Sequence, residues 1–333
     1  MRGHEIRELL RMRKIAVLCG GVGGARFAQA LYASFPAASL NLIVNVGDDF
    51  EHLGLKICPD LDTVYYTLTG RNDEARGWGV AGESWHCLET LSALGAESWF
   101  QLGDWDLALH LARTEMIRKG ARLTEVCAHL VQQSKLKCTL LPVTDDPLRT
   151  QIRSRGQVLD FQEYFVREKC APVYDGVLFA GAETAQMTPE VKGLLTGKGI
   201  DCLMIAPSNP YLSIAPMLAI PGMREALHNR QFPVIAVSPL IGGQAVKGPL
   251  VKIMAERGMS PSPVGIAQEY AGLIDGFVCD IADQTKQEEL EAMGVQVKFT
   301  ETLMSKPGVK KTLAEAALAF AQAIGAAETK DPS

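Results

Sequence analysis

The chain has 333 residues, with 33 Lys and Arg against 38 Asp and Glu, so its formal net charge is −5. Hydrophobic residues make up 47% and charged residues 21%, proportions that exclude a disordered or fibrous protein and predict a globular one. The acidic balance excludes a broad basic surface for nucleic acid, so we expect no nucleic-acid partner. A single phosphate ligand is not excluded, because it needs only a local cluster of donors.

Cysteine spacing and hydropathy indicate where such a protein is found. The eight cysteines contain no Cys-x-x-Cys pair, which is typical of separate, reduced thiols in a cytoplasmic protein. The longest charge-free stretch, 202–223, contains four prolines, so we predict a strand and a loop rather than a membrane span. The apolar run after the charged N-terminal segment is too short for a signal peptide, and we expect no membrane association.

The first elements in the chain are predicted to be a strand, a glycine turn and a helix. Ile15–Cys19 is an apolar run that stops at the glycine-rich segment 20–24, and a helical pattern follows. A second buried strand, Leu40–Val46, comes next and implies a parallel pair. Further strand-like runs, several of them separated by helical stretches, are 138–143, 176–179, 202–206, 234–237 and 276–279. This pattern predicts an α/β fold with a mostly parallel sheet.

Residues 77–133 lack a clear strand, and we predict a helical insert there between the second and third strands of the sheet. The core then comprises 14–76 and 134–325. The helices expected in the insert are Ser84–Leu94, Asp104–Lys119 and Leu123–Gln133. All four tryptophans fall in this insert, where they form either a small core of its own or an aromatic wall for a flat ligand.

The last predicted helix follows Thr312. Glu315 stands three residues later, which is the spacing of a capping box. The apolar run from Leu313 to Ile324, interrupted by Glu315 and Gln322, predicts an amphipathic helix.

The glycine turn is the first candidate for chemistry. Glycines let a backbone approach a phosphate, and the helix that follows presents free N–H groups and a partial positive charge. Arg26 stands where a dinucleotide fingerprint needs glycine or alanine, and the Gly-Lys-Ser/Thr of a P-loop is absent. We therefore predict a phosphate-binding loop of neither standard type, the alternative being a tight turn without a ligand.

Acidic residues follow the second strand and recur shortly afterwards. Asp48 and Asp49 end that strand, at the edge that faces the ligand crevice in a doubly wound sheet. Asp60 and Asp62 lie one residue apart soon after, and with Asp48 they form a plausible Mg²⁺ site. The alternative for Asp60 is the N-cap of a helix that starts near Thr63.

Later loops add neutral polar groups at the same edge. Ser208 and Asn209 follow a buried strand, and a glycine-rich turn at 238–243 follows the next one. No histidine has an evident Ser or Cys partner for a nucleophilic triad. The loops therefore favour binding and positioning of phosphates over acyl chemistry.

Taken together, these motifs resemble the 2-phospho-L-lactate transferase (CofD) family over nearly the whole chain, from Lys14 to about Ile324. The matching blocks are GGVGGARF (20–27), NVGDDF (45–50), CPDLDTVYYTL (58–68), GWGVAGESW (77–85), WFQLGDWDLALH (99–110), LPVTDDPLRT (141–150), FQEYFV (161–166), APSNPYLSIAPMLAIPGMR (206–224) and VSPLIGGQAVKGP (237–249). Each block is weak alone, but the combination is specific.

The resemblance implies a fold and a reaction. The fold is a three-layer α/β/α Rossmann-like core with a helical subdomain. The reaction moves a phospho-acid group (2-phospholactyl, phosphoenolpyruvyl or phosphoglyceryl) from a guanosine-diphosphate-activated donor to the ribityl hydroxyl of the deazaflavin Fo. GMP is released, Mg²⁺ is required, and the product belongs to factor 420 biosynthesis. The family also implies a homodimer.

The resemblance also implies roles for particular residues. Asp48 and Asp62 are expected to bind Mg²⁺ or to orient the attacking hydroxyl, and Asp62→Asn is expected to abolish turnover with the fold intact. The donor's guanosine diphosphate part is expected on Gly20, Gly21, Gly23, Gly24, Ser208 and Asn209. The Fo acceptor is expected at Asp62, Gln101 and Asp104.

This chain departs from the family pattern inside the insert. Gln101 and Trp105 stand where members often have basic residues, and Leu109 stands where they commonly have Thr. Two other functions remain open. One is a non-catalytic nucleotide-sugar-binding regulator of the same superfamily, which the PDLDT block at 59–63 disfavours. The other is an NAD-dependent dehydrogenase, which Arg26 disfavours.

Overall fold

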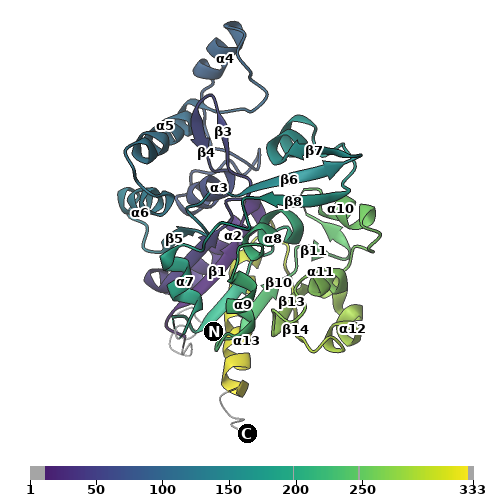
Figure 1. The fold of residues 1–333 in the computed structure, drawn as a ribbon. Helices are drawn as coiled ribbons and strands as arrows, with labels where there is room; N and C mark the ends of the chain where they lie inside the picture. Colours follow the sequence, from purple (N-terminus) through teal and green to yellow (C-terminus); the bar gives the residue numbers. More distant parts are fainter. Residues whose placement is uncertain (1–11, 198, 247, 329–333) are drawn as a thin grey trace.

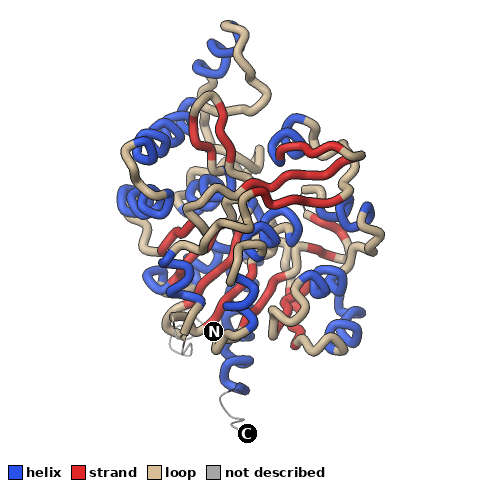
Figure 2. Tube along the Cα trace, in the orientation of Figure 1, coloured by secondary structure: helices blue, strands red, loops and turns tan. Residues whose placement is uncertain are grey.

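The computed structural model describes residues 12–197, 199–246 and 248–328. A seven-stranded sheet forms its centre, and every adjacent pair of strands in it is parallel. In sheet order the strands are β14 (Gln296–Thr300), β13 (Gly276–Asp280), β10 (Val234–Val237), β9 (Cys202–Ile205), β1 (Ile15–Cys19), β2 (Leu40–Val44) and β5 (Thr139–Pro142). Helices cover both faces (Figures 1 and 2), which confirms the predicted α/β/α architecture.

The central strands are apolar because neither of their faces meets water. Every residue of β1, β2, β9, β10 and β13 is buried. Parallel sheets with helices on both sides require such continuous apolar runs, and these runs made the strands visible in the sequence. Helices α2 (Gly21–Ser34), α3 (Pro59–Leu68) and α13 (Val309–Glu328) form one layer, in which α2 contacts both of the others.

The order of the strands sets the place of the ligand crevice. The chain runs from β1 outward to β2 and β5, returns to β9, and then continues the other way to β10, β13 and β14. The direction reverses between β1 and β9, and ligands of doubly wound sheets bind at the carboxyl ends of the strands at such a point. The backbone N–H of Gly20 donates to the Ser208 hydroxyl at 3.1 Å, which joins the ends of these two strands.

The segment between β2 and β5 holds the predicted insert. The hairpin of β3 (Phe50–His52) and β4 (Leu55–Ile57) precedes α3, and the helices α4 (His86–Ala93), α5 (Asp104–Arg118) and α6 (Leu123–Gln133) follow it. The three helices lie close to their predicted positions. The hairpin was not predicted, because three-residue strands are too short to show an alternating pattern. Helix α4 has no buried residue and projects at the top of Figure 1.

The segment between β5 and β9 forms a second sheet that the sequence did not predict. The strands β6 (Arg149–Ser154), β7 (Gln157–Asp160) and β8 (Gly176–Ala180) form a separate antiparallel sheet in the order β7-β6-β8. The predicted run 176–179 is therefore a strand, but it lies outside the central sheet. The remaining elements are α7 (Pro189–Leu195), α8 (Ala215–Leu218), α9 (Met223–His228), β11 (Leu240–Ile241), β12 (Gln244–Ala245), α10 (Leu250–Glu256), α11 (Pro263–Glu269) and α12 (Gln287–Glu291).

The last helix begins earlier than predicted. Helix α13 starts at Val309, so Thr312 lies inside its first turn, where the hydroxyl donates to the carbonyl of Gly308 at 3.3 Å. The predicted capping box at Thr312 is therefore wrong. All eight cysteines are free thiols, as expected. Within the described ranges, the helices are too short or too polar to cross a bilayer.

Candidate active site

Glycines allow the loop after β1 to pack directly against the loop after β9. A Cβ on Gly23 would lie 2.5 Å from the carbonyl oxygen of Pro207, and one on Gly24 would lie 2.5 Å from the Ser208 hydroxyl. Both are far inside van der Waals contact, so only glycine fits at either position. Helix α2 therefore starts at the switch point itself, with its N-terminus at the carboxyl edge of the sheet.

Two of the amides at this N-terminus already have protein partners. The Gly20 N–H donates to Ser208, and the Gly21 N–H donates to Asp60 Oδ1 at 2.6 Å. First-turn amides of a helix have no intrahelical acceptor, and in the described part of the chain no side chain accepts from Val22 or Gly23. These two amides remain for an anionic ligand.

Asp60 does not cap a helix at Thr63, because α3 begins at Pro59. Its carboxylate instead crosses to the glycine turn and to Asn45, whose Nδ2 donates to Asp60 Oδ2 at 3.0 Å. Burial raises the pKa of Asp60 to about 6, against the hydrogen bonds from Asn45 and Gly21, which lower it. Asp60 therefore does not cap a helix. It lies beside the glycine turn at the carboxyl edge of the sheet, which we call the rim.

The side-chain amide of Asn45 also contacts Asp48. Asn45 Nδ2 lies 3.3 Å from Asp48 Oδ1, and the Gln162 side chain donates to the Asp48 carbonyl at 3.1 Å. Burial raises the pKa of Asp48 well above its ordinary value, and the nearby Asp60 raises it further. Two buried carboxylates held by one neutral amide lack positive charge, so this pair attracts protons or a cation.

Asp49 faces a different set of partners. Its carboxylate lies 2.9 Å from Lys56 Nζ and accepts from the Cys58 thiol at 3.0 Å. Burial raises the pKa of Asp49, and Lys56 opposes that rise. The two adjacent acids at the end of β2 therefore differ: Asp49 has a cation of its own, whereas Asp48 has none.

Asp62 is paired with a buried arginine from the insert. Both of its carboxylate oxygens accept from the guanidinium of Arg113, the Nη1 to Oδ2 distance being 3.0 Å. Arg113 is 2% exposed and Asp62 is 5% exposed. The predicted Mg²⁺ site therefore has two distinct parts, an unneutralised Asp48–Asp60 pair and a neutralised Asp62.

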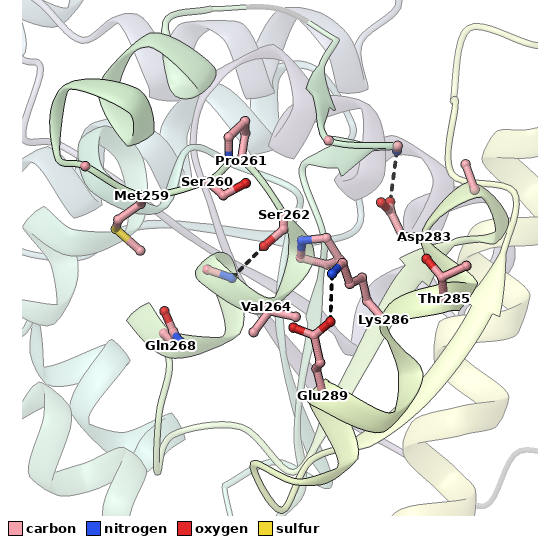
Figure 3. A pocket seen from close by; sticks show the side chains of 16 residues that line it. Met259, Ser260, Pro261, Ser262, Val264, Gln268, Asp283, Thr285, Lys286 and Glu289 are labelled. Carbon is pink, nitrogen blue, oxygen red and sulfur yellow. Dashed lines mark hydrogen bonds and ion pairs between the residues drawn. The ribbon is translucent and has the colours of Figure 1, made fainter.

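Two cavities are lined by loops that follow strands of the central sheet. One of about 240 Å³ lies beside Asp48, between residues 47–52 and 149–167, and Trp99 of the insert borders it. The other, of about 620 Å³, is lined by residues from 242–243, 258–268 and 282–289 (Figure 3). In the second cavity the Asp283 carboxylate accepts from the Gly242 N–H at 3.0 Å. One cavity thus lies toward the insert, and the other lies beyond β10.

Comparison with known proteins fits this geometry. The family model for "2-phospho-L-lactate transferase CofD" matches residues 15–316. The chain belongs to the CofD family. Its relatives include the phosphoenolpyruvate transferase of Streptomyces coelicolor, 38% identical over 93% of this chain and 99% of that one. The 2-phospho-L-lactate transferase of Methanosarcina mazei is 34% identical over 90% of this chain and 97% of that one.

A solved structure shares the fold of this CofD-family chain at lower identity. A protein of the UPF0052 family from Bacillus halodurans superposes with a TM-score of 0.60 and 17% identity, covering 93% of this chain and 99% of that one. At that identity the likeness concerns the architecture alone.

Two further residues predicted to bind the nucleotide, Ser208 and Asn209, form hydrogen bonds within the loops of this CofD-family chain. The Ser208 hydroxyl accepts from Gly20 N–H and donates to the Gly20 carbonyl at 2.8 Å. Asn209 Oδ1 accepts from the amides of Tyr211 and Leu212 at 3.0 and 3.2 Å, which leaves its Nδ2 as a donor. Whether either residue contacts a nucleotide stays a prediction.

Of the three predicted acceptor residues, Asp62 lies on α3, whereas Gln101 and Asp104 lie in the insert, near the start of α5. The Asp104 carboxylate accepts from the Ser84 hydroxyl at 2.6 Å and from the first amides of α4, so it caps that helix. Gln101 is exposed. Their predicted role in acceptor binding stays a prediction.

The tryptophans do not form a core for the insert. None of the four is buried; Trp78 is 41% exposed and Trp105 is 58% exposed. Arg76 lies 4.8 and 4.9 Å from the ring centroids of Trp78 and Trp85, and Arg71 lies 5.4 Å from that of Trp105. The mini-core interpretation is therefore wrong, and the aromatic-wall interpretation stays open.

Sequence reasoning missed two contributors to the site, Asn45 and Arg113. Asn45 begins the family-like block 45–50, but its link to Asp48 and Asp60 depends on tertiary structure. Arg113 had a signal, because Asp106, His110 and Arg113 follow the spacing of a single helix face. No group of three or more His, Cys, Asp or Glu side chains in the described ranges is arranged to hold a metal ion.

Proposed function

We propose that the chain transfers a phospho-acid group from a guanosine-diphosphate-activated donor to the ribityl hydroxyl of the deazaflavin Fo, releasing GMP, as a step of factor 420 biosynthesis. The single observation that supports this best is the rim at the switch point. There the first turn of α2, in which no side chain accepts from Val22 or Gly23, adjoins an unneutralised pair of carboxylates, to which the Gly21 N–H and Asn45 connect it. The relatives named phosphoenolpyruvate transferase and 2-phospho-L-lactate transferase support the same reaction.

In this proposal the donor's pyrophosphate binds at the N-terminus of α2. Val22 and Gly23 donate their amides, and the helix dipole favours the negative charge. The guanosine extends past Asn209, whose Nδ2 is free to donate, toward the 620 Å³ cavity of Figure 3. Glycine at 23 and 24 keeps the two loops close enough to shape one continuous surface.

The residues present fit a magnesium ion at Asp48 and Asp60. Mg²⁺ sites that act on phosphates commonly use one or two carboxylates and complete their shell with water and phosphate oxygens, so a cluster of three protein ligands is not needed. Burial is the main cause of the raised pKa of both acids, and no Lys or Arg side chain forms an ion pair with either of them in the described ranges. A bound Mg²⁺ would neutralise the charge that develops on the pyrophosphate.

Asp62 then acts on the acceptor side. A carboxylate has about four lone-pair sites, and Arg113 uses two of them. We propose that a remaining site accepts the proton of the attacking ribityl hydroxyl. The new O–P bond forms at the phosphorus that carries the acid, and the P–O bond to GMP breaks. Positioning and charge neutralisation supply most of the catalysis in such transfers.

The acceptor would enter from the insert, through the 240 Å³ cavity beside Asp48. Phe50, Trp99 and Phe161 border that cavity and offer aromatic faces to a planar ring. We further propose that the enzyme is cytoplasmic and works as a homodimer.

The test is direct incubation of the full chain with Fo, Mg²⁺ and each GDP-activated acid in turn, followed by the mass of the product. We expect Fo carrying one of the three phospho-acids, and an equimolar release of GMP. Failure of every donor to yield a product would overturn the proposal. Heat protection by a UDP-sugar or NAD, with none by GDP, would point to one of the rival functions.

Asp48→Asn sharpens the same test. It keeps the size of the side chain but removes the charge that binds the cation, so we expect kcat to fall at least about 100-fold with GDP still bound. Glu115→Gln, which removes an exposed carboxylate that borders neither cavity, serves as the control. Equal activity of the Asp48→Asn variant and the wild-type protein would exclude a cation at this position.

A further inference from the structure

Helix α5 presents a polar face to the core. Asp106, His110 and Arg113 lie four and then three residues apart, which places them on one side of the helix. That side meets Asp62 and Tyr66 on α3. His110 is 1% exposed and Arg113 is 2% exposed, so this part of the face is closed to water, whereas Asp106 is half-buried.

The five side chains form a continuous chain of contacts. The Tyr66 hydroxyl donates to Asp106 Oδ1 at 2.6 Å, and His110 Nε2 lies 3.3 Å from the same oxygen. His110 Nδ1 lies 3.3 Å from Arg113 Nη1, and Arg113 donates to both oxygens of Asp62. The chain thus runs from the insert to the rim of the proposed active site.

The donors in this chain can be assigned from chemistry. A guanidinium only donates, so His110 Nδ1 is the acceptor in its contact with Arg113. The ring proton is then on Nε2, which faces Asp106. Arg113 Nη1 also lies 3.3 Å from the carbonyl oxygen of Lys56 on β4. The guanidinium is therefore fixed from three directions, by Asp62, by His110 and by the backbone of the hairpin.

Stability alone does not explain this arrangement. A buried ion pair loses much of its attraction to desolvation, and well-packed apolar side chains of similar size often do as well. Arg113 also binds in the bidentate geometry that fixes the plane of a carboxylate, which a lysine does not reproduce.

We propose that Arg113 is a positioning residue that fixes the orientation of the Asp62 carboxylate for the acceptor hydroxyl, and that His110 orients Arg113. This inference rests on the proposed function, because it assigns a task to Asp62 in that reaction. Neither residue touches the substrate. Their effect reaches the reacting atoms through the plane of one carboxylate, so a small rotation of Asp62 lowers the rate without weakening the binding of the donor.

Two substitutions at His110 separate orientation from packing. Asn places an amide oxygen near the position of Nδ1, so His110→Asn keeps an acceptor for Arg113. Gln reaches the position of Nε2, so His110→Gln keeps the contact with Asp106 and loses that acceptor. We expect kcat to fall about 100-fold in His110→Gln and several-fold less in His110→Asn, with the KM for the donor unchanged in both.

Arg113→Lys and Thr114→Val form a second matched pair. Thr114 adjoins Arg113 and accepts from the Lys56 N–H at 2.9 Å, so it also ties α5 to β4, but it has no contact with Asp62. We expect both variants to melt at lower temperature. Only Arg113→Lys should lose about 100-fold in kcat, because one ammonium does not fix both carboxylate oxygens.

The outcomes distinguish this inference from the proposed function. Equal losses of kcat in His110→Asn and His110→Gln, or in Arg113→Lys and Thr114→Val, would overturn the positioning role while wild-type transfer remains intact. If the wild-type protein transfers no acid at all, the proposed function fails. Crystal structures of the two His110 variants then decide the geometry: Asp62 should keep its orientation in His110→Asn and turn in His110→Gln, and an unchanged Asp62 in both overturns the inference.

Discussion

The insert has an inner and an outer half, and they hold charge in opposite ways. The inner half, the face of α5 toward the core, buries Arg113 and His110 against Asp62. The outer half, from Trp78 to Trp105, keeps its charged and aromatic groups at the surface, and α4 has no buried residue. The difference indicates that the inner half is fixed relative to the rim, whereas the outer half is free to adapt to a ligand.

The two halves also differ in the cost of losing a partner. A buried charge without its partner cannot be rehydrated, whereas an exposed group exchanges its partner for water. Substitutions in the inner half should therefore change the stability of the whole chain. Substitutions in the outer half should act locally.

The largest expected effect is that of Asp62→Asn. The change leaves the Arg113 charge buried without its counter-charge, so the free energy of unfolding should fall by about 3–5 kcal/mol, measured by urea denaturation. This revises the sequence-based expectation that the variant keeps its fold intact. Glu115→Gln, which removes an exposed ion pair with Lys119 on the same helix, should leave the melting temperature unchanged. A loss below about 1 kcal/mol in Asp62→Asn would show that the buried contacts between α3 and α5 are hydrated.

Asp60→Asn should raise the free energy of unfolding near neutral pH, whereas Asp62→Asn lowers it. The pKa of Asp60 is raised in the folded protein, so the folded state binds its proton more tightly than the unfolded chain does. Without divalent cations, the free energy of unfolding should therefore fall as the pH rises from about 4 to about 6. A rise from 3.8 to about 6 corresponds to about 3 kcal/mol.

The Asp60→Asn variant lacks this titration, so at pH 7.5 it should be more stable than the wild-type protein in EDTA. Added Mg²⁺ should stabilise the wild-type protein more than the variant, because the cation replaces the proton on the carboxylate. Parallel stability curves for the two proteins between pH 4 and pH 7.5 would contradict the assignment of Asp60 to the cation pair.

The smallest expected effect is that of Asp104→Ala in the outer half. The Ser84 hydroxyl and the first amides of α4 lose their acceptor, and the hydrogen bonds that lower the pKa of Asp104 are lost with them. Amide exchange at Cys87 should accelerate, while the global melting temperature stays within about 2 °C of the wild type. A large drop in melting temperature would show that α4 is part of the cooperative core.

The sequence was sufficient for the central sheet because burial on both faces leaves an unmistakable apolar run in each strand. It was insufficient for the short elements around the site. The hairpin at 50–57 is formed by strands of three residues each, which are too short to show an alternating pattern. In the sheet of β6–β8, the partners of β6 on β8 lie more than 20 residues further along the chain. Their positions depend on tertiary contacts that local pattern does not encode.

The same division applies to the site. Asp48 and the glycine turn could be placed from the sequence because each directly follows a buried strand. That position puts both at the carboxyl edge of the sheet. The different partners of Asp60 and Asp62 were not predictable from their spacing, because one side chain turns to Asn45 and the other to Arg113. Two carboxylates one residue apart thus face different neighbours, which only the packing of α3 against α2 and α5 determines.

Pro142 closes the edge strand β5, where it lies opposite Val44 of β2. A proline has no N–H to offer a further strand, so this margin of the sheet resists extension by another chain. At the opposite margin, β14 carries Lys298 at its middle, and a charged edge likewise discourages strand addition. The chemistry of both borders therefore opposes a central sheet that continues across two copies of the chain.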